Sequence, residues 1–354
     1  MTSNRPQRPQ PPSRPNRSSG GGSSPELAPK PYEFVSFPKE RPNLQRPAGH
    51  HKYFSDRLHG TLYLTLKVQT SLHVSTGVVV MGSDIGSDRI PLIKTMVQGV
   101  DQKLSIGGSS LKGCIRSVYE AITNSTLAVI TNKYRSQIPQ ERLPCYNKEE
   151  LCPASRVFGA LNWQGLLDFN EAKCESMGFS TGFMPSLYRP RPDERSAYFI
   201  QGRVAGRKFY YHTIRAIDKG QNSGIPVQQA GREYIFKTQL NFKNLLPEEL
   251  GTLLIVLGQD SKCPIALKVG GGKPIGMGTM TVTIDKIARS QSLQKRYSAY
   301  KLNESDELIG DALQQFMQTQ IQAAYSRLIQ QPQLDELKAV LRYPSDREPP
   351  SGMY

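Results

Sequence analysis

The chain has 354 residues, of which 37% are hydrophobic and 21% are charged, enough for one large or two ordinary domains. Its 45 Lys and Arg exceed its 30 Asp and Glu, which gives a formal net charge of +15. This excess is typical of proteins that bind polyanions, nucleic acid above all, although ribosomal and anionic-membrane proteins share it. Most of it lies beyond residue 49, because residues 1–49 hold eight Lys or Arg and three Glu.

The sequence argues against membrane-spanning and disulfide-rich secreted proteins. No apolar run approaches the roughly 20 residues that span a bilayer, and the polar N-terminus lacks the apolar stretch of a signal peptide. Five cysteines are an odd and sparse count, which indicates a reducing compartment. We therefore expect a cytoplasmic protein that makes no membrane contact.

The first half of the chain predicts a disordered arm, a strand and a helix. Residues 1–31 are rich in Pro, Arg and Gly and offer almost nothing to bury, so we expect no fixed structure there. Alternating apolar residues between 60 and 68 predict a half-buried strand. Residues 74–108 read as a long irregular stretch. Residues 109–122 predict a helix with one apolar stripe, capped by Ser109 or Ser110.

The second half predicts a similar order of elements. Alternation between 234 and 242 indicates a strand, and PEELGTLLIVL begins a helix with Pro247 in its first turn. A short strand, a glycine-rich segment and another alternating strand follow, up to about residue 285. This order favours an α+β fold with a ferredoxin-like or RRM-like palm.

We therefore expect one palm domain over residues 32–285, with a large insertion at about 125–230. Helical periodicity dominates from 303 to 341, so residues 286–354 are predicted to form a linker and a C-terminal helical extension.

The segment GGSSLKGCIRS, at the start of the predicted helix, has the features of a phosphate-binding turn. Its glycines let a ligand approach the backbone, and the hydroxyls of Ser109 and Ser110 can donate hydrogen bonds. Lys112 and Arg116 are one turn apart, so both cations lie on one side of the helix. This fits contacts with an RNA backbone. A tight strand-to-helix turn with ordinary surface charges explains the segment equally well.

A second segment, GGGKPIGMG, places five glycines around Lys273. It is not a Walker A loop, because Pro274 follows the lysine and a strand follows the segment. The glycines suit close packing against another backbone, of protein or nucleic acid, or a plain glycine-rich hairpin.

Taken together and in order, these motifs resemble the RAMP (repeat-associated protein) superfamily of CRISPR effector subunits, most closely the guide-RNA-binding backbone proteins of type III complexes. The matching pieces run from about residue 31 to 285 and comprise PYEFVSFP, SLHVSTG, GGSSLKGCIRS, CPASRVFG, GRKFYYH, FKTQLNFKNLLPEELGTLLIVLG and KVGGGKPIGMGTMTV. The resemblance implies a palm, a thumb-like hairpin formed by the mid-chain insertion, and stacking with other effector subunits along a guide RNA and its complementary target. An RNA-binding protein of the ribosome is the unrelated alternative.

The resemblance also implies which residues contact RNA. In this family the GSS-L-[KR]-G helix start contacts the guide backbone, which points here to Ser109, Ser110, Lys112 and Arg116. Lys273 of the glycine-rich loop is a further candidate. Basic and aromatic residues alternate around Arg207 and Lys208, and these aromatics could stack on bases. A buried strand with a basic turn is the other interpretation of that segment.

Several type III backbone subunits cleave target RNA with an aspartate on the loop before this helix. The family pattern places this aspartate shortly before a proline that is followed by a hydrophobic residue. Here that pair is Pro91-Leu92, which implies Asp88 as the first candidate and Asp84 as the second. Such a carboxylate could hold Mg²⁺ at the scissile phosphate or assist attack by the 2′-hydroxyl, making the chain a metal-dependent endoribonuclease. Aspartates that only form turns, in a purely structural subunit, are the alternative. A guide-processing enzyme would instead use a histidine as its base.

Three cysteines lie where some family members carry a small structural Zn²⁺ site, namely Cys145, Cys152 and Cys174. Zinc in such sites takes four S or N ligands. Here Ser155 stands where those members often have a further cysteine. Buried thiols without a metal are the other interpretation.

Overall fold

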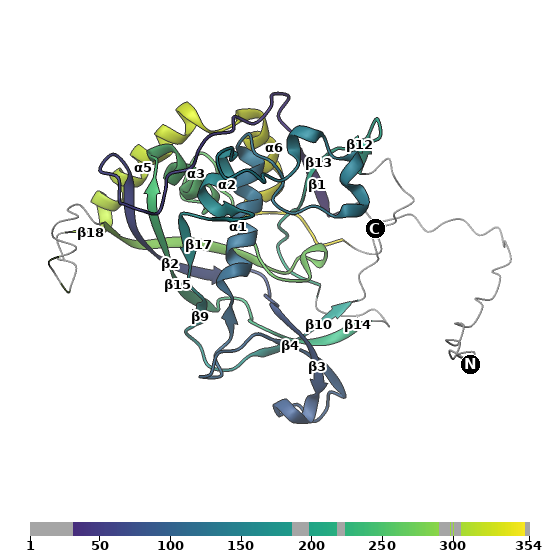
Figure 1. Cartoon of the computed structure of the whole chain (residues 1–354). Helices are drawn as coiled ribbons and strands as arrows, with labels where there is room; N and C mark the ends of the chain where they lie inside the picture. The colour runs from purple at the N-terminus through teal and green to yellow at the C-terminus, as the bar shows by residue number, and fades with distance from the viewer. Residues whose placement is uncertain are drawn as a thin grey trace, which may run out of the picture.

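The computed structural model describes residues 31–185, 198–217, 224–289, 298, 300 and 306–350 (Figure 1). The predicted disordered arm lies outside the described residues except for Pro31, and so does most of the predicted linker. The predicted α+β class is confirmed: antiparallel sheets and several helices make up the described part.

One long strand forms the centre of the main sheet. Strand β2 (Leu58–Val68) pairs antiparallel with β15 (Ile235–Leu245) on one side and β17 (Thr279–Arg289) on the other. Its alternate side chains face the core and are at most 3% exposed, as the period-two pattern predicts: Leu62, Leu64, Leu66 and Val68.

The sheet continues outward from these three strands in the order β16-β17-β2-β15-β9-β5. Two further strands add to it, β8 against β15 and β18 against β17. The short members are β5 (Ser105–Ile106), β8 (Leu167–Phe169), β9 (Ala172–Cys174), β16 (Leu267–Lys268) and β18 (Glu307–Leu308).

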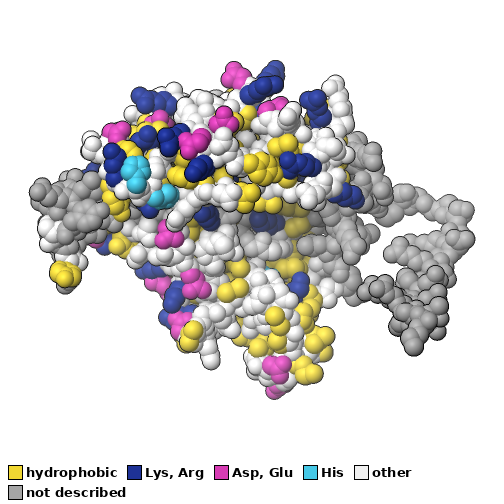
Figure 2. Space-filling model, viewed as in Figure 1, with side chains coloured by type: hydrophobic (Ala, Val, Ile, Leu, Met, Phe, Trp, Pro, Cys, Tyr) yellow, Lys and Arg dark blue, Asp and Glu magenta, His cyan; other side chains and the backbone are white. Residues whose placement is uncertain are grey.

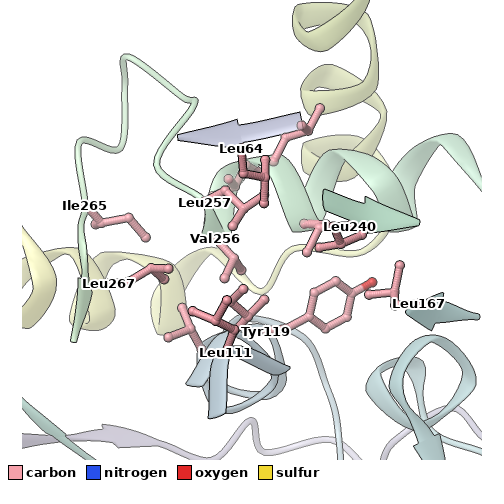
Figure 3. Packing of buried hydrophobic residues seen from close by; sticks show 14 of the residues in the cluster. Leu64, Leu111, Tyr119, Leu167, Leu240, Val256, Leu257, Ile265 and Leu267 are labelled. Carbon is pink, nitrogen blue, oxygen red and sulfur yellow. The ribbon is translucent and has the colours of Figure 1, made fainter. Parts of the chain in front are cut away.

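Helices α1 (Gly108–Ile122) and α3 (Pro247–Val256) supply the other half of the core. Figure 3 shows Tyr119 of α1, Val256 of α3 and Leu240 of β15 converging in one apolar cluster. Helix α1 is amphipathic, and the apolar stripe read from the sequence is its buried face. Its opposite face, with Lys112 and Ser117, remains at the surface.

The C-terminal helices close the body of the molecule. Helix α5 (Gly310–Arg327) packs against α3, and α6 (Gln331–Leu341) packs against α1 and the first strand, β1 (Tyr32–Ser36). Glu336 of α6 accepts hydrogen bonds from the backbone N–H of Ser36 at 2.6 Å and from its hydroxyl at 2.9 Å. The two ends of the described chain are thus fastened together.

A second sheet projects from the body at the bottom of Figure 1. Its order is β10-β14-β4-β3, with the strands β3 (Ser75–Met81), β4 (Leu92–Met96), β10 (Ser180–Pro185) and β14 (Gly224–Gln229). The interpretation of residues 74–108 as an irregular stretch is therefore wrong. Strands β3 and β4 form an antiparallel hairpin. Its sequence does not alternate between apolar and polar residues, because apolar side chains such as Val78, Met81 and Leu92 are exposed.

Short elements complete the described part of the chain. They are η1 (Gly82–Ile85), η2 (Asn132–Gln137), η3 (Gln140–Arg142), α2 (Pro153–Phe158), β6 (Gly159–Ala160), β7 (Trp163–Gln164), β11 (Phe199–Ile200), β12 (Arg203–Val204), β13 (Gly206–Tyr210) and η5 (Lys273–Ile275). Strand β13 pairs antiparallel with β1, and β6 with β7.

The glycine-rich segment turns back tightly between β16 and β17. Gly278 has a φ of +86°, and a Cβ there would collide with the carbonyl oxygen of Val269. Gly270 has a φ of +77°, and a Cβ there would collide with the carbonyl oxygen of His73. These glycines are therefore required by protein packing.

We expect Gly278→Ala to lower the free energy of unfolding by more than about 1 kcal/mol, because the left-handed backbone and the close carbonyl both oppose a side chain. Gly113→Ala is the matched control, since Gly113 lies on the exposed face of α1 with open space around it. It should raise stability by about 0.5–1 kcal/mol. Denaturant titration measures both, and equal effects would contradict the packing role.

Candidate nucleic-acid interface

The first turn of α1 exposes two hydroxyls at the surface. Ser109 and Ser110 are both exposed, as expected of RNA-contacting residues. The predicted capping role is wrong: the N-cap is Gly107, and no side chain caps this end. The backbone turn from β5 into Gly108 fixes the helix start instead, because a Cβ at Gly108 would meet the carbonyl oxygen of Phe169.

Lys112 and Arg116 lie one turn apart, as predicted, but in different environments. Lys112 is half-buried, and its pKa is lowered first by burial and then by the positive charge of Arg116, while Asp168 opposes the shift. Arg116 is held by protein groups. Its Nε donates to Glu120 at 2.7 Å and its Nη1 to the carbonyl of Gly159 at 2.9 Å.

Arg207 is mostly buried, at the wall of a surface hollow that Lys208 also lines. Its side chain is 9% exposed, and its Nη1 donates to the second oxygen of Glu120 at 2.7 Å. Its Nη2 donates to the carbonyls of Ser125 and Thr126 at 3.1 and 2.9 Å. The guanidinium is therefore held by protein groups, and its contact with RNA stays a prediction.

Lys208, the next residue along β13, is bound by aromatic rings. Its Nζ lies over the rings of Tyr32, Tyr210 and Tyr198, at 4.0, 4.8 and 5.5 Å from their centroids. A cation held this way is attracted to the ring faces. Of the three aromatics expected to stack on bases, Tyr210 is engaged with this lysine, Phe209 is buried, and Tyr211 lies 4.7 Å from the Arg347 guanidinium.

Two adjoining hollows follow the surface of α1, and together we call them the α1 groove. One, of about 600 Å³, is lined by Lys112, Arg135 and Tyr146 among others. The other, of about 410 Å³, is lined by Ser117 and by Lys208 of β13. Both share Arg116, Ala128 and Val129. Glu120 is the one acidic residue that lines either hollow, and it is paired with two arginines.

The α1 groove is therefore a positive surface that begins near Lys112, while Ser109 and Ser110, in the preceding turn of α1, line neither hollow. Such a surface suits phosphates, which require no base readout. Arg135 was not predicted. It comes from η2 in the insertion, and no local signal in the sequence separates it from the other surface cations.

The glycine-rich loop lies against the same helix. The thiol of Cys114 in α1 donates to the carbonyl of Lys268 at 3.3 Å. Lys273 is half-buried in this loop, and its charge acts on both Cys114 and Lys268. Lys273 is thus close to α1 although neither hollow of the groove includes it.

Lys268 is buried beneath this loop, where its Nζ donates to the carbonyl of Gly276 and the hydroxyl of Thr279, both at 3.2 Å. Burial, aided by the charge of Lys273, lowers its pKa to about 7. The Nδ1 of His212 is hydrogen-bonded to the same Thr279 hydroxyl at 3.0 Å. Burial, and then the charge of Lys268, lower the pKa of His212 to about 3.

Three histidines have structural environments. His73 and His59 are buried, and their ring nitrogens are hydrogen-bonded to the carbonyls of Gln228 and Phe54 at 2.7 and 2.8 Å. His212 is fully buried as well. This disfavours these three as the general base of a guide-processing enzyme.

Asp84 and Asp88 are both exposed on the connection between β3 and β4. Asp84 lies in η1, and its carboxylate accepts the N–H of Met81 at 3.2 Å. Among the residues that the structure describes, no three His, Cys, Asp or Glu side chains gather to hold a metal. One or two carboxylates still fit Mg²⁺, because this ion commonly takes its remaining ligands from water and phosphate.

The cysteines lie in two places. Cys145 and Cys152 are adjacent, with the N–H of Cys152 donating to the Cys145 sulfur at 3.4 Å and Thr126 Oγ1 within 3.4 and 3.2 Å of the two sulfurs. Cys174 lies in β9, where it pairs with Phe236. No group of three His, Cys, Asp or Glu side chains gathers around these two thiols in the described part of the chain, and a zinc site, which takes four ligands, stays a prediction.

The fold and the groove define an α+β protein with a basic surface along one helix. A family model of the RAMP superfamily matches residues 65–281, which is more than half of the chain. The chain therefore belongs to the RAMP superfamily, and this membership supports a CRISPR-associated, RNA-binding function. A search of curated proteins found no match. No described helix has the length and apolar character needed to cross a membrane.

We expect Glu120→Gln to destabilise the protein by about 3–5 kcal/mol, because it leaves two buried arginines without their shared carboxylate. Glu149→Gln is the control: its ion pair with Arg46 is exposed, so the loss should stay below about 1 kcal/mol. Chemical denaturation checks both, and a similar small loss in both variants would show that Glu120 does not hold the two arginines.

Lys268 should make a contribution to stability that rises with pH between about 7 and 10.5. Its pKa is about 7 in the folded chain and has an ordinary value of 10.5, so the unfolded chain binds more protons in that window. Lys268→Met removes this contribution and should flatten the rise in Tm with pH. Lys262→Met, at an exposed lysine, should leave the rise unchanged. An unchanged rise in Lys268→Met would refute the shifted pKa.

Proposed function

We propose that this chain is a guide-RNA-binding backbone subunit of a type III CRISPR effector complex. The observation that carries the proposal is the α1 groove, a basic surface that starts at the GSSLKG turn and runs toward β13. Phosphates of a single strand would lie along it, contacted by Ser109, Ser110 and Lys112, with Lys273 near its edge. The complementary target and neighbouring effector subunits are the other partners.

The strand order supports the proposed palm. The middle of the main sheet contains four strands, which occur along the chain in the order β2, β9, β15 and β17. Across the sheet their order is β17-β2-β15-β9. Helix α1 lies between β2 and β9 in the chain, and α3 between β15 and β17. This is the arrangement of a ferredoxin-like unit. We propose the projecting β3–β4 hairpin as the thumb, in place of the mid-chain insertion that was expected to form it.

The thumb carries both the candidate aspartates and an apolar surface. Figure 2 shows hydrophobic side chains around an acidic one at the tip of the projecting sheet. Exposed apolar side chains on this hairpin include Val78, Met81 and Leu92. We propose that this surface meets the guide–target duplex and brings Asp88, or Asp84, to the target backbone. A subunit that binds RNA without cleaving it is the alternative.

RNA binding is tested with Lys112→Gln. We expect the affinity for labelled single-stranded RNA to fall about three- to tenfold, and the slope of log K against log salt to decrease by about 0.7, because one phosphate contact is lost. Fluorescence anisotropy at several salt concentrations measures both. The control is Lys262→Gln, which lines neither hollow of the groove and should bind as the unchanged chain does. Equal binding by both variants would contradict the proposed path.

Cleavage is tested in the assembled complex with Asp88→Asn and Asp84→Asn. If Asp88 is the cleaving residue, its variant should lose cuts in a guide-complementary RNA by at least about a hundredfold while still binding that RNA, and chelation of Mg²⁺ should have the same effect. Asp101→Asn, at a turn nearer α1, is the control. Persistence of every cut in both thumb variants favours the structural alternative.

A further inference from the structure

A third hollow, of about 690 Å³, adjoins the α1 groove at Trp163. Residues 46–57, which lead into β2, form most of its wall, together with Lys148 and Glu149 of the insertion. Trp163 lines this hollow and the larger part of the α1 groove alike. We call it the Trp163 cleft. Figure 2 shows histidine side chains at the upper left of the view, among basic, acidic and hydrophobic ones.

Aromatic and imidazole rings make up much of the cleft. Trp163 is held in β7 by the tight β6–β7 hairpin, in which Ala160 pairs with Trp163. The His50 ring lies 5.6 Å from the Trp163 ring, and the His51 and Phe54 rings are also 5.6 Å apart. Flat rings of this kind offer stacking surfaces to nucleobases of any sequence.

Two polar atoms in these rings lack a partner among the described residues. His50 Nε2 lies 2.9 Å from the carbonyl of Gln164, which can only accept, so Nε2 carries the proton and Nδ1 is an acceptor in the neutral ring. Nδ1 of His50 and the indole N–H of Trp163 are both buried and unsatisfied. The rings of the cleft thus hold one unsatisfied acceptor and one unsatisfied donor, the two kinds of group with which a nucleobase edge pairs.

The charges around the rings suit a phosphate. Arg46 pairs with Glu149 at 2.7 Å, and Arg57 lies 3.8 Å from Asp56. Both acidic residues of the cleft are therefore paired, and Lys148 adds a further positive charge. The balance is positive, so an anion is favoured over a cation.

We propose that the Trp163 cleft binds one nucleotide of a single-stranded RNA, with its base on the rings and its phosphate at Arg57 and Lys148. The strand would pass from the α1 groove across Trp163 into this cleft. The inference rests on the proposed function, since it extends the path of the same RNA strand.

Trp163 is the only tryptophan in the chain, so its fluorescence reports on the junction of the cleft and the α1 groove. We expect a uridine tetranucleotide to quench it in the full-length protein. Arg57→Gln and Lys148→Gln should each raise the tetranucleotide concentration needed for half-maximal quenching at least fivefold. Because the Lys148 side chain is exposed, a folding defect would not explain the effect of its variant. Lys262→Gln, at an exposed lysine that lines neither the cleft nor the α1 groove, should change it less than twofold.

Two results would overturn the inference while leaving the proposed function intact. In one, the quenching responds to Arg135→Gln, on the α1 groove side of Trp163, and to neither cleft variant, which puts the oligonucleotide in the α1 groove. In the other, the tetranucleotide causes no quenching although a longer RNA still binds by anisotropy. Failure of the longer RNA to bind would instead overturn the proposed function.

Discussion

The carboxylate of Glu120 is the interaction on which the candidate interface depends. It joins Arg116 of its own helix to Arg207 of β13, both at 2.7 Å. The two arginines extend the network to the carbonyls of Gly159, Ser125 and Thr126. Buried charges are tolerated only when they are paired and hydrogen-bonded. Helix α1, strand β13 and the segments that contain these three carbonyls are therefore held in one fixed arrangement. The walls of the α1 groove are the outer surfaces of the same segments.

The parts of the fold that the sequence predicts are those with a local pattern. The alternating residues of β2 and the apolar stripe of α1 each bury one face, and a period of 2.0 or 3.6 reveals them without knowledge of their partners. The β3–β4 hairpin was missed because Val78 and Met81 are exposed, so no alternation distinguishes an inner face. The pairing of β1 with β13 joins residues far apart in the chain, and no local pattern encodes it.

The same distinction applies to the site. The exposure of Ser109 and Ser110 follows from their place in the first turn of a helix, and the sequence supplies that place. The burial of Arg207 depends on Glu120, which is 87 residues away, so a basic run near aromatics gave no sign of it. The Trp163 cleft combines residues of separate loops, and a lone tryptophan in a turn-rich segment was the only hint of it.

The contact of Glu336 with Ser36 has a consequence for synthesis of the protein. Helix α6, which fastens strand β1, is synthesised 300 residues after it. Strand β1 is also the partner of β13, which forms part of the α1 groove. This wall of the groove therefore gains the support of α6 only after a long stretch of intervening chain has been made.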